Sequence, residues 1–593
     1  MMNTKRYFQL LLVPLLGCAV VFLTPQKVAA DADRAPANND SGSATTDHAP
    51  AGPRQKSPNV TINLIHRLVD RGVLSAEDAR ELIQQAENDA AEARAQVAKP
   101  EAEPVPKDTV SVRYVPEIVK LQMRDEIKEE VLKQARDEHW AAPNMLPAWV
   151  SRLGVKGDLR VRYENDAFPK GNNNTGEFPN FNAINTGAPF DTTGTAFSPQ
   201  RDVDQERNRF RIRARMGTEI NLENGFTAGL RLATGENNSP VTQNQSLGAA
   251  NSAQGGNFSK YAVWLDQAFL KYEWGGLPTK NLAVSVGRFE NPFFSTSILW
   301  ANDLGFDGLA VQGRQAVGDG LTAFGSGGAF PVFNTDLNFS SNRPQKYPST
   351  DKWLYGGQVG LDWKINEDFN FKGAGAFYYF ENIEGKLSAP VVLTSSADQG
   401  NTDDTRPAFA QYGNTYMNLR NITPTADNGF GTKNQWQYFG LATPFHDAAF
   451  TGRLDYKHFE PFVISLTGEF VENIAFDQAR INTLAVNNGG LGHFVGGDTG
   501  WIVGLKLGAV VLQKRWDWNI GIDYRYVASD AVVDGFCDSD FGGGGTNVKG
   551  YSINAALALA PKIALGLHWL SSDQVAGPTL KADTLQLDVN AKW

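Results

Sequence analysis

Seven arginines that alternate with apolar residues are the strongest sign of chemistry in the chain. Alternation places every second side chain of a β-strand on the same face of a sheet. An arginine that faced lipid at mid-depth would cost about 2 to 4 kcal/mol, so we expect all seven to point into the lumen of a barrel and form a basic wall there. The seven are Arg160, Arg162, Arg209, Arg211, Arg213, Arg215 and Arg231.

The segment between Glu290 and Gly308 combines carboxylates with aromatic rings such as those of Phe293 and Trp300. Aromatic side chains are costly to display to water, so we expect this connection to fold back into the barrel as a constriction loop. Its acids would then face the arginine wall and create a transverse field that filters polar solutes. The alternative is that the arginines pair with carboxylates only to brace the barrel. The acids are Glu290, Asp303 and Asp307.

Other chemistry is weaker in the sequence. Asp534, Asp538 and Asp540 lie beside a glycine run and could hold calcium, but an ordinary acidic loop explains them as well. The histidines are scattered, and no Gly-x-Ser-x-Gly nucleophile motif occurs. We therefore expect no enzyme activity, no cofactor and no metal site.

A period of two runs from Gly154 to the end of the chain and predicts an all-β barrel of about sixteen antiparallel strands. In the last segment Leu585, Leu587 and Val589 alternate with polar residues. The predicted strands are 155–163, 207–221, 225–234, 260–274, 280–289, 307–316, 321–330, 352–364, 369–381, 451–458, 461–471, 500–513, 517–528, 548–560, 562–572 and 581–593.

Short and long connections alternate between these strands. Bacterial membrane barrels have short turns on the periplasmic side and long loops outside, and closure removes sheet edges that lipid could not satisfy. A soluble β-sandwich or propeller predicts no such alternation. The composition agrees, because the 593 residues include 58 glycines and are only 41% hydrophobic, so no large soluble core is expected.

The N-terminus predicts export from the cytoplasm. Lys5 and Arg6 precede an apolar run and a small-residue site at residues 28–30, which is typical of a signal peptide over residues 1–30. A lipoprotein site at Cys18 is the competing interpretation, although the residues after it remain apolar. Without Cys18 the chain keeps Cys537 alone, so no intrachain disulfide is expected. The net charge of the full chain is −10, and removal of Lys5, Arg6 and Lys27 would make it more negative, which argues against nucleic acid as a partner.

Between the signal peptide and the barrel the sequence predicts two further parts. Residues 31–58 have the composition of a disordered linker. Residues 59–140 show apolar residues at helical spacing and predict a small helical periplasmic segment, followed by the barrel over residues 150–593. These helices would pack on each other, associate with other copies, or contact the cell wall.

Seven segments of the chain share the pattern of one known family. They are Leu64–Ile83, Arg207–Asn221, Gly287–Phe293, Phe306–Ala310, Tyr524–Tyr526, Asp534–Phe536 and Asp540–Asn547. In these segments the chain resembles the putative porins of the bacterial outer membrane, a family of the general trimeric-porin kind. The resemblance implies a sixteen-stranded barrel in the outer membrane, contact with its lipid, and a homotrimer. It supplies no particular substrate.

We therefore expect a channel for passive diffusion of small hydrophilic solutes and ions, with a basic lumen wall and a weak preference for anions. A structural protein that tethers the outer membrane to the cell wall through residues 59–140 is the alternative. An energy-coupled receptor would need a globular plug, and residues 31–150 consist largely of predicted linker and helix.

Overall fold

The computed structural model describes residues 152–593, except positions 173, 237, 238, 252, 253, 278, 279 and 335–346, and it also describes the helical residues 80, 84 and 88. The predicted signal peptide (1–30) and linker (31–58) lie outside the described residues. So does all of the predicted helical segment (59–140) except those three positions.

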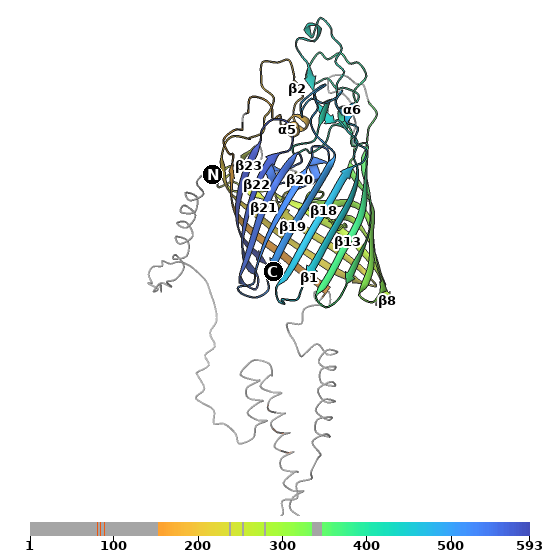
Figure 1. Cartoon of the computed structure of the whole chain (residues 1–593), viewed down its shortest axis with the longest axis vertical. Coiled ribbons are helices and arrows are strands. Elements are labelled where there is room, and N and C mark those ends of the chain that lie inside the picture. The colour runs from red at the N-terminus through yellow and green to blue at the C-terminus, as the bar shows by residue number, and fades with distance from the viewer. Residues whose placement is uncertain are drawn as a thin grey trace, which may run out of the picture. The chain divides into compact units, whose positions relative to one another are not determined.

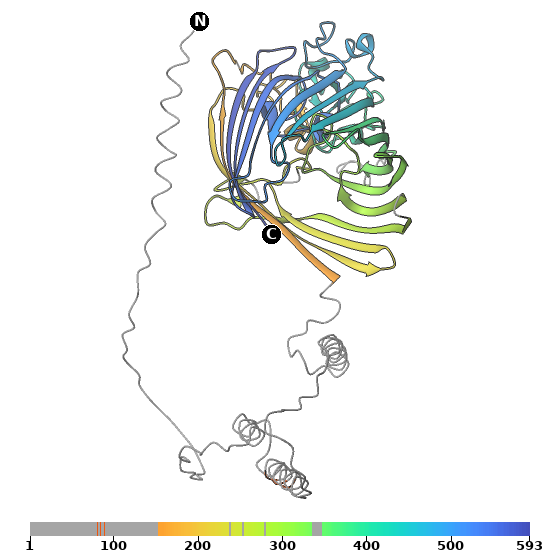
Figure 2. The same cartoon turned by 60° about the horizontal axis from the view of Figure 1, so that its bottom comes forward.

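Sixteen antiparallel strands close into one barrel, in which β23 returns to pair with β1 (Figures 1 and 2), as the alternating sequence predicts. Each strand pairs with the next one around the ring. The strands are β1 (Leu153–Ala167), β3 (Arg207–Glu223), β4 (Phe226–Thr234), β8 (Val263–Leu277), β9 (Lys280–Glu290), β10 (Gly305–Gly318), β11 (Leu321–Phe333), β12 (Lys352–Lys364), β13 (Phe369–Glu381), β17 (His446–Tyr456), β18 (Val463–Asn473), β19 (Thr499–Gly508), β20 (Trp518–Val527), β21 (Val548–Ala560), β22 (Ile563–Gln574) and β23 (Lys581–Lys592).

Most predicted strand limits lie within a few residues of the observed ones, and β17 and β19 differ most. Strand β17 begins at His446, five residues before the predicted start, because its inward side chain Ala449 is buried in an apolar cluster and breaks the expected polar alternation. Strand β19 ends at Gly508, since Val510 and Val511 belong to the following turn and are exposed.

The connections separate the barrel into two ends (Figure 1). At the turn end the strands are joined tightly, for example through Gly225 and Gly320, whose positive φ angles of 84° and 68° favour glycine. At the loop end the long connections fold into short elements of their own. These elements are α5 (Phe181–Thr186), β2 (Phe190–Asp191), β5 (Gln245–Ser246), β6 (Ala250–Asn251), β7 (Gln254–Gly255), β14 (Tyr416–Asn418), β15 (Trp436–Gln437), β16 (Phe439–Leu441), α6 (Gln478–Ile481) and four 3₁₀ turns at Asp403–Thr405, Gly429–Gly431, Asp534–Phe536 and Phe541–Gly543.

Within the described part of the chain, no helix has the length and apolar character needed to cross a membrane.

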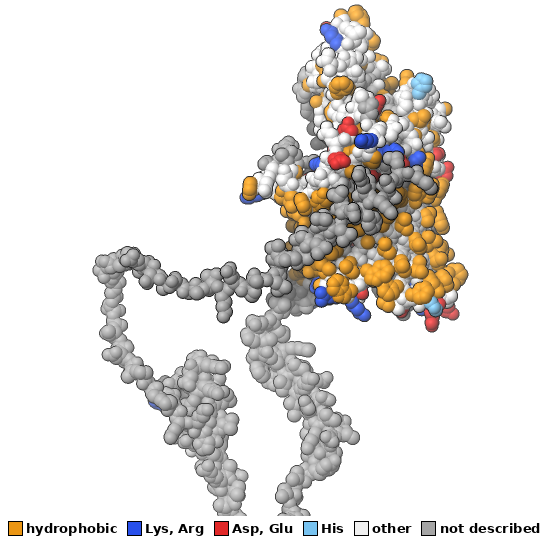
Figure 3. All heavy atoms as spheres, turned by 60° about the vertical axis from the view of Figure 1, so that its left-hand side comes forward, with side chains coloured by type: hydrophobic (Ala, Val, Ile, Leu, Met, Phe, Trp, Pro, Cys, Tyr) orange, Lys and Arg blue, Asp and Glu red, His pale blue; other side chains and the backbone are white. Residues whose placement is uncertain are grey.

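Large apolar side chains cover the outside of the barrel. Figure 3 shows them as a band over the strands, with charged side chains at its lower edge and among the loops above. Phe210, Val359 and Ile522 are 58%, 73% and 52% exposed, which is unfavourable in water and favourable in hydrocarbon. The buried core lies inside the barrel, where inward side chains pack against the loops that enter from the loop end.

We predict that arginine substitutions on the outer face of β1 destabilise the barrel more at mid-depth of the apolar band than near its edge. Val161 lies midway along the strand and faces outward, so Val161→Arg should cost about 2 to 4 kcal/mol of folding free energy in lipid. Val155 faces outward near the turn end, and Val155→Arg should cost only about 0 to 1 kcal/mol. Urea-dependent folding into vesicles measures both values, and equal costs would show that Val161 does not lie at mid-depth.

Candidate functional site

The seven arginines lie on three neighbouring strands, β1, β3 and β4, and point into the barrel. The register sets Arg160 opposite Arg213 and Arg162 opposite Arg211, so these side chains share one face of the sheet. Leu159, Val161 and Phe210 are exposed on the other face, toward lipid. We call the seven residues the arginine ladder.

Carboxylates neutralise this ladder. Arg162 is only 3% exposed and makes a bidentate contact with Asp588 of β23, with Nε to Oδ1 at 2.7 Å and Nη2 to Oδ2 at 2.9 Å. Its Nη1 donates to Asp540 Oδ2 at 2.9 Å. Buried ion pairs of this kind are stable only when both charges keep their partners. The ladder therefore fastens β23 to β1 across the closure of the barrel.

The rest of β1 supplies carboxylates to β3. Glu164 accepts hydrogen bonds from Arg211 at 3.2 Å and also binds Arg209. Asp158 binds Arg213 at 3.1 Å and Arg215 at 2.6 Å. These contacts form because every second residue of β1 from Asp158 to Asp166 is charged, which puts all of these side chains on the inner face.

One connection and the strands β8 and β9 contribute further carboxylate partners. Asp303, in the connection between β9 and β10, accepts a hydrogen bond from Arg213 at 3.0 Å. Glu290, the last residue of β9, accepts one from Arg231 at 2.6 Å, and Arg231 also binds Asp266 of β8. The ladder arginines are thus paired with carboxylates on neighbouring strands and with one carboxylate on the connection that was predicted to enter the lumen.

Arg160 is the exception in the ladder, because no carboxylate among the described residues forms an ion pair with it. Its guanidinium donates to the amide oxygen of Asn244, and its neighbours are Arg162 and Arg213. The other six arginines share eight carboxylates. These are Asp158, Glu164, Asp166, Asp266, Glu290, Asp303, Asp540 and Asp588.

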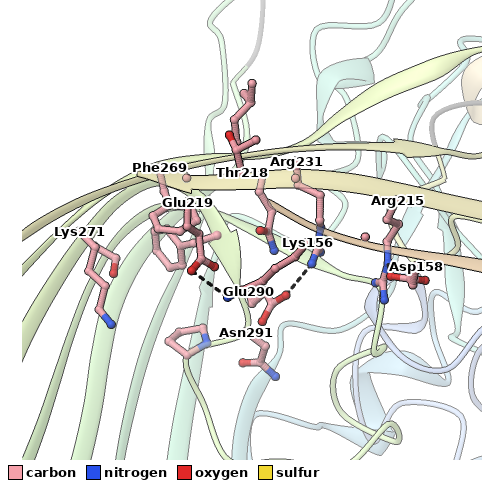
Figure 4. A pocket seen from close by; sticks show the side chains of 18 of the residues that line it. Lys156, Asp158, Arg215, Thr218, Glu219, Arg231, Phe269, Lys271, Glu290 and Asn291 are labelled. Atoms are coloured by element: carbon pink, nitrogen blue, oxygen red, sulfur yellow. Dashed lines mark hydrogen bonds and ion pairs between the residues drawn. The ribbon is translucent and has the colours of Figure 1, made fainter. Parts of the chain in front are cut away.

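Two cavities lie along the ladder. One of about 610 Å³ opens at the turn end and is lined by Asp158, Arg215, Arg231 and Glu290 (Figure 4). Lys156 and Glu219 form an ion pair at 2.9 Å in the same cavity. The other, of about 410 Å³, lies at the loop end and includes Arg209, Arg211 and Asp540 in its lining. The middle of the ladder, around Arg162 and Arg213, separates the two.

Comparison with known proteins places the chain in a family. Residues 58–593 match the family model described as "Putative porin". The chain belongs to this porin family. The porin therefore lies in the bacterial outer membrane, and its family is one of channels. No curated protein matches it in sequence.

The solved structures that match this porin share little sequence with it. OprB of Pseudomonas putida at high pH is 10% identical, with 75% of this chain and 95% of that chain covered and a TM-score of 0.40. The channel DcaP of Acinetobacter baumannii is 10% identical, with 75% and 98% covered and a TM-score of 0.31. OmpF of Salmonella typhi, in complex with daunomycin, is 10% identical, with 74% and 97% covered and a TM-score of 0.34.

The structure separates the three acids that the sequence suggested for one constriction loop. Asp303 lies in the inward connection, and Glu290 ends β9 and turns toward Arg231. Asp307 was predicted wrongly. It lies on β10 beside the buried, inward-facing Phe306, so strand alternation turns it outward, where it pairs with Arg288 at 2.8 Å.

Sequence reasoning missed most of the carboxylates that hold the arginines. Asp158, Glu164 and Asp166 occur at a spacing of two around Arg160 and Arg162, so the pattern was visible in the sequence. Asp588 also follows the alternation of its strand, but its pairing with Arg162 depends on closure of the barrel.

The acidic segment that could have held calcium is used differently. Asp540 binds Arg162, Asp538 binds Arg525 of β20 at 2.6 Å, and Asp534 accepts a hydrogen bond from Tyr416 at 3.2 Å. Over the described residues, no group of three or more His, Cys, Asp or Glu side chains is arranged to hold a metal ion.

Burial and charge shift the pKa values of these loop acids in opposite directions. Burial raises the pKa of Asp530 to about 6 and that of Asp534 to about 6, because neither carboxylate forms an ion pair among the described residues. Burial also disfavours the charged form of Asp540, but the guanidinium of Arg162 outweighs it and holds the pKa of Asp540 below its usual range.

We predict that the two ladder arginines Arg162 and Arg160 differ sharply in their contribution to stability. Arg162→Gln leaves Asp588 and Asp540 without their cation and should cost about 3 to 5 kcal/mol. Arg160→Gln removes no ion pair and should cost less than about 1 kcal/mol. The urea midpoint of barrel unfolding measures both changes. Similar losses in the two variants would contradict the pairing described here.

We also predict that the loop packing becomes more stable as the pH falls through 6. Asp530 accepts hydrogen bonds from Thr415 N at 2.8 Å, Thr415 Oγ1 at 2.6 Å and Ser529 Oγ at 2.7 Å. Its folded-state pKa is raised, so folding favours the protonated acid, and ionisation above about pH 6 destabilises the folded loops by roughly 1 to 3 kcal/mol.

This dependence appears in thermal unfolding between about pH 4, near the pKa of an aspartate in the unfolded chain, and about pH 6.5, just above the folded-state pKa of Asp530. Asp530→Asn should remove the part of this pH dependence of stability that comes from Asp530. Asp540 should add little in this window, because its pKa is lowered. If Asp530→Asn keeps the full slope, the titration of Asp530 is not its source.

Proposed function

We propose that this porin lets small hydrophilic solutes and ions diffuse passively across the outer membrane, driven by their own concentration gradients. The observation that carries the proposal is the polar strip of the lumen along the arginine ladder, with a cavity at each end. The outer membrane lipid would contact the apolar band, and the homotrimer implied by the resemblance is part of the proposal. The proposed function involves no catalytic step and no cofactor.

The ion preference of this channel should be small. The carboxylates around the ladder balance its arginines, so the excess of positive charge that the sequence suggested is largely cancelled along the ladder. Arg160 keeps a positive charge without an ion pair, and Asp303 places a negative charge on the inward loop. We propose that these two groups set the local field that a permeating ion meets.

We predict opposite shifts in reversal potential when these two charges are removed. In a planar bilayer at low salt, Arg160→Ser should shift the potential toward cations, and Asp303→Asn should shift it toward anions. Both shifts should fade at about 1 M salt, where the Debye length is about 3 Å. Conductance that is absent in the unmodified porin would reject the proposed function.

A control separates local from general charge effects. Glu219→Gln removes an acid from the turn-end cavity, away from the middle of the ladder, and should shift the potential less than Asp303→Asn does. A larger shift for Glu219→Gln would place the selective region at the turn end.

A further inference from the structure

A lysine of the lumen wall is held between two aromatic rings. Lys372 of β13 lies on the same face of its strand as the buried Ala374, so it points into the barrel. Its Nζ lies 4.3 Å from the ring centroid of Phe294, in the connection after β9, and 4.8 Å from that of Phe324 on β11. Because an ammonium group is attracted to the face of an aromatic ring, both contacts restrict the lysine to one position.

The barrel wall fixes both rings. Phe324 stands opposite Gly360 of β12, where a Cβ atom would collide with the ring, so the glycine leaves room for it. The main chain of Phe294 is anchored to Gln358 of β12, which accepts a hydrogen bond from its N at 2.8 Å and donates one to its O at 2.8 Å. The positions of the two rings therefore do not depend on a ligand.

Lys372 has neither an ion pair nor a hydrogen-bond acceptor among the described residues. The register sets it beside Asp362 and Arg453 on the neighbouring strands. Asp362 pairs with Arg314 at 3.7 Å, and Arg453 pairs with Asp455 at 2.8 Å, so the nearby carboxylates have other partners. The ammonium group therefore keeps a positive charge and three hydrogen-bond donors for a group that the described chain does not supply.

A cavity of about 360 Å³ lies in front of this lysine. Its lining includes Lys372, the two phenyl rings and Arg314, and its carboxylate Glu273 is paired with Lys271. Lys271, which Figure 4 labels, and Pro292 also line the turn-end cavity, so the two cavities adjoin. The volume is within the range of about 300 to 1,000 Å³ that small-molecule sites occupy. The lysine cavity thus has the size of a solute site and lies next to open lumen.

We infer that this cavity binds small aromatic carboxylates, with the carboxylate on Lys372 and the ring of the solute against Phe294 and Phe324. Both phenyl rings are only half-buried, and exposed rings beside an unpaired cation match a solute that carries an apolar ring and a negative charge. An inorganic anion would pair with the lysine but leave the rings uncovered. The inference rests on the proposed channel function, because the solute reaches the cavity through the lumen.

Block of the ion current by benzoate tests this site. The unmodified porin is inserted into a planar bilayer in potassium chloride, and benzoate, acetate or benzamide is added on both sides. Acetate carries the charge without the ring, and benzamide carries the ring without the charge. We expect benzoate to reduce the conductance in a saturable way, at concentrations at least about tenfold lower than either of the other two solutes requires.

Substitutions of two lysines separate the site from the general charge of the lumen. Lys372→Met should raise the half-blocking benzoate concentration at least about tenfold, and Lys372→Arg, which keeps the cation, should change it less than about threefold. No carboxylate loses its partner in Lys372→Met, so the barrel should fold. Lys506→Met is the matched control, because Lys506 of β19 lines another cavity, of about 370 Å³, whose described lining has no Phe, Tyr or Trp. It should change the block less than about twofold.

Equal weakening of the block in Lys372→Met and Lys506→Met would show that benzoate senses only the general charge, and the inference would be wrong. Acetate that blocks as well as benzoate would also overturn it, because the rings would then contribute nothing. An unmodified porin that never conducts would instead reject the proposed function. Saturation-transfer NMR of benzoate with the detergent-solubilised porin then still decides the site, since binding should be lost in Lys372→Met and kept in Lys506→Met.

Discussion

Six of the seven ladder guanidinium groups keep a carboxylate inside this barrel, because hydrocarbon lies on one side of the wall and a packed interior on the other. Arg160, which donates to the amide oxygen of Asn244, is the exception. Turning outward would cost several kcal/mol, and staying inside unpaired would leave a buried charge without a partner. Arg162, with Asp588 and Asp540, shows the solution in its simplest form. The strand register, the loop positions and the location of the polar side all follow from satisfying such groups.

The loops are placed by the same requirement. Asp303 and Asp540 reach the ladder from opposite connections, and between these anchors the loops present apolar side chains such as Trp300 to the far wall. Charge on one flank and packing on the other hold these two loops in place. The same residues therefore set both the packing and the distribution of charge inside the barrel.

The sequence predicted the architecture well because a period of two leaves a strong signal in every strand, and each error has a local cause. Asp307 was assigned to a loop, but the strand begins two residues earlier, and that start decides which way its side chain points. The inward fold of residues 291–304 followed from aromatic residues that avoid water. The part played by Asp540 could not be predicted, since its partner Arg162 is 378 positions away and no local pattern links them.

The contact between Arg162 and Asp588 also bears on how the barrel closes. These two residues belong to the first and last strands, so the pair exists only after the sheet has closed. A slip of two residues at the seam would set Arg162 opposite Gln586 or Asn590 and leave Asp588 without its cation. Neutralisation of charge therefore favours the native register at the seam, because either slipped register would bury charges without their partners.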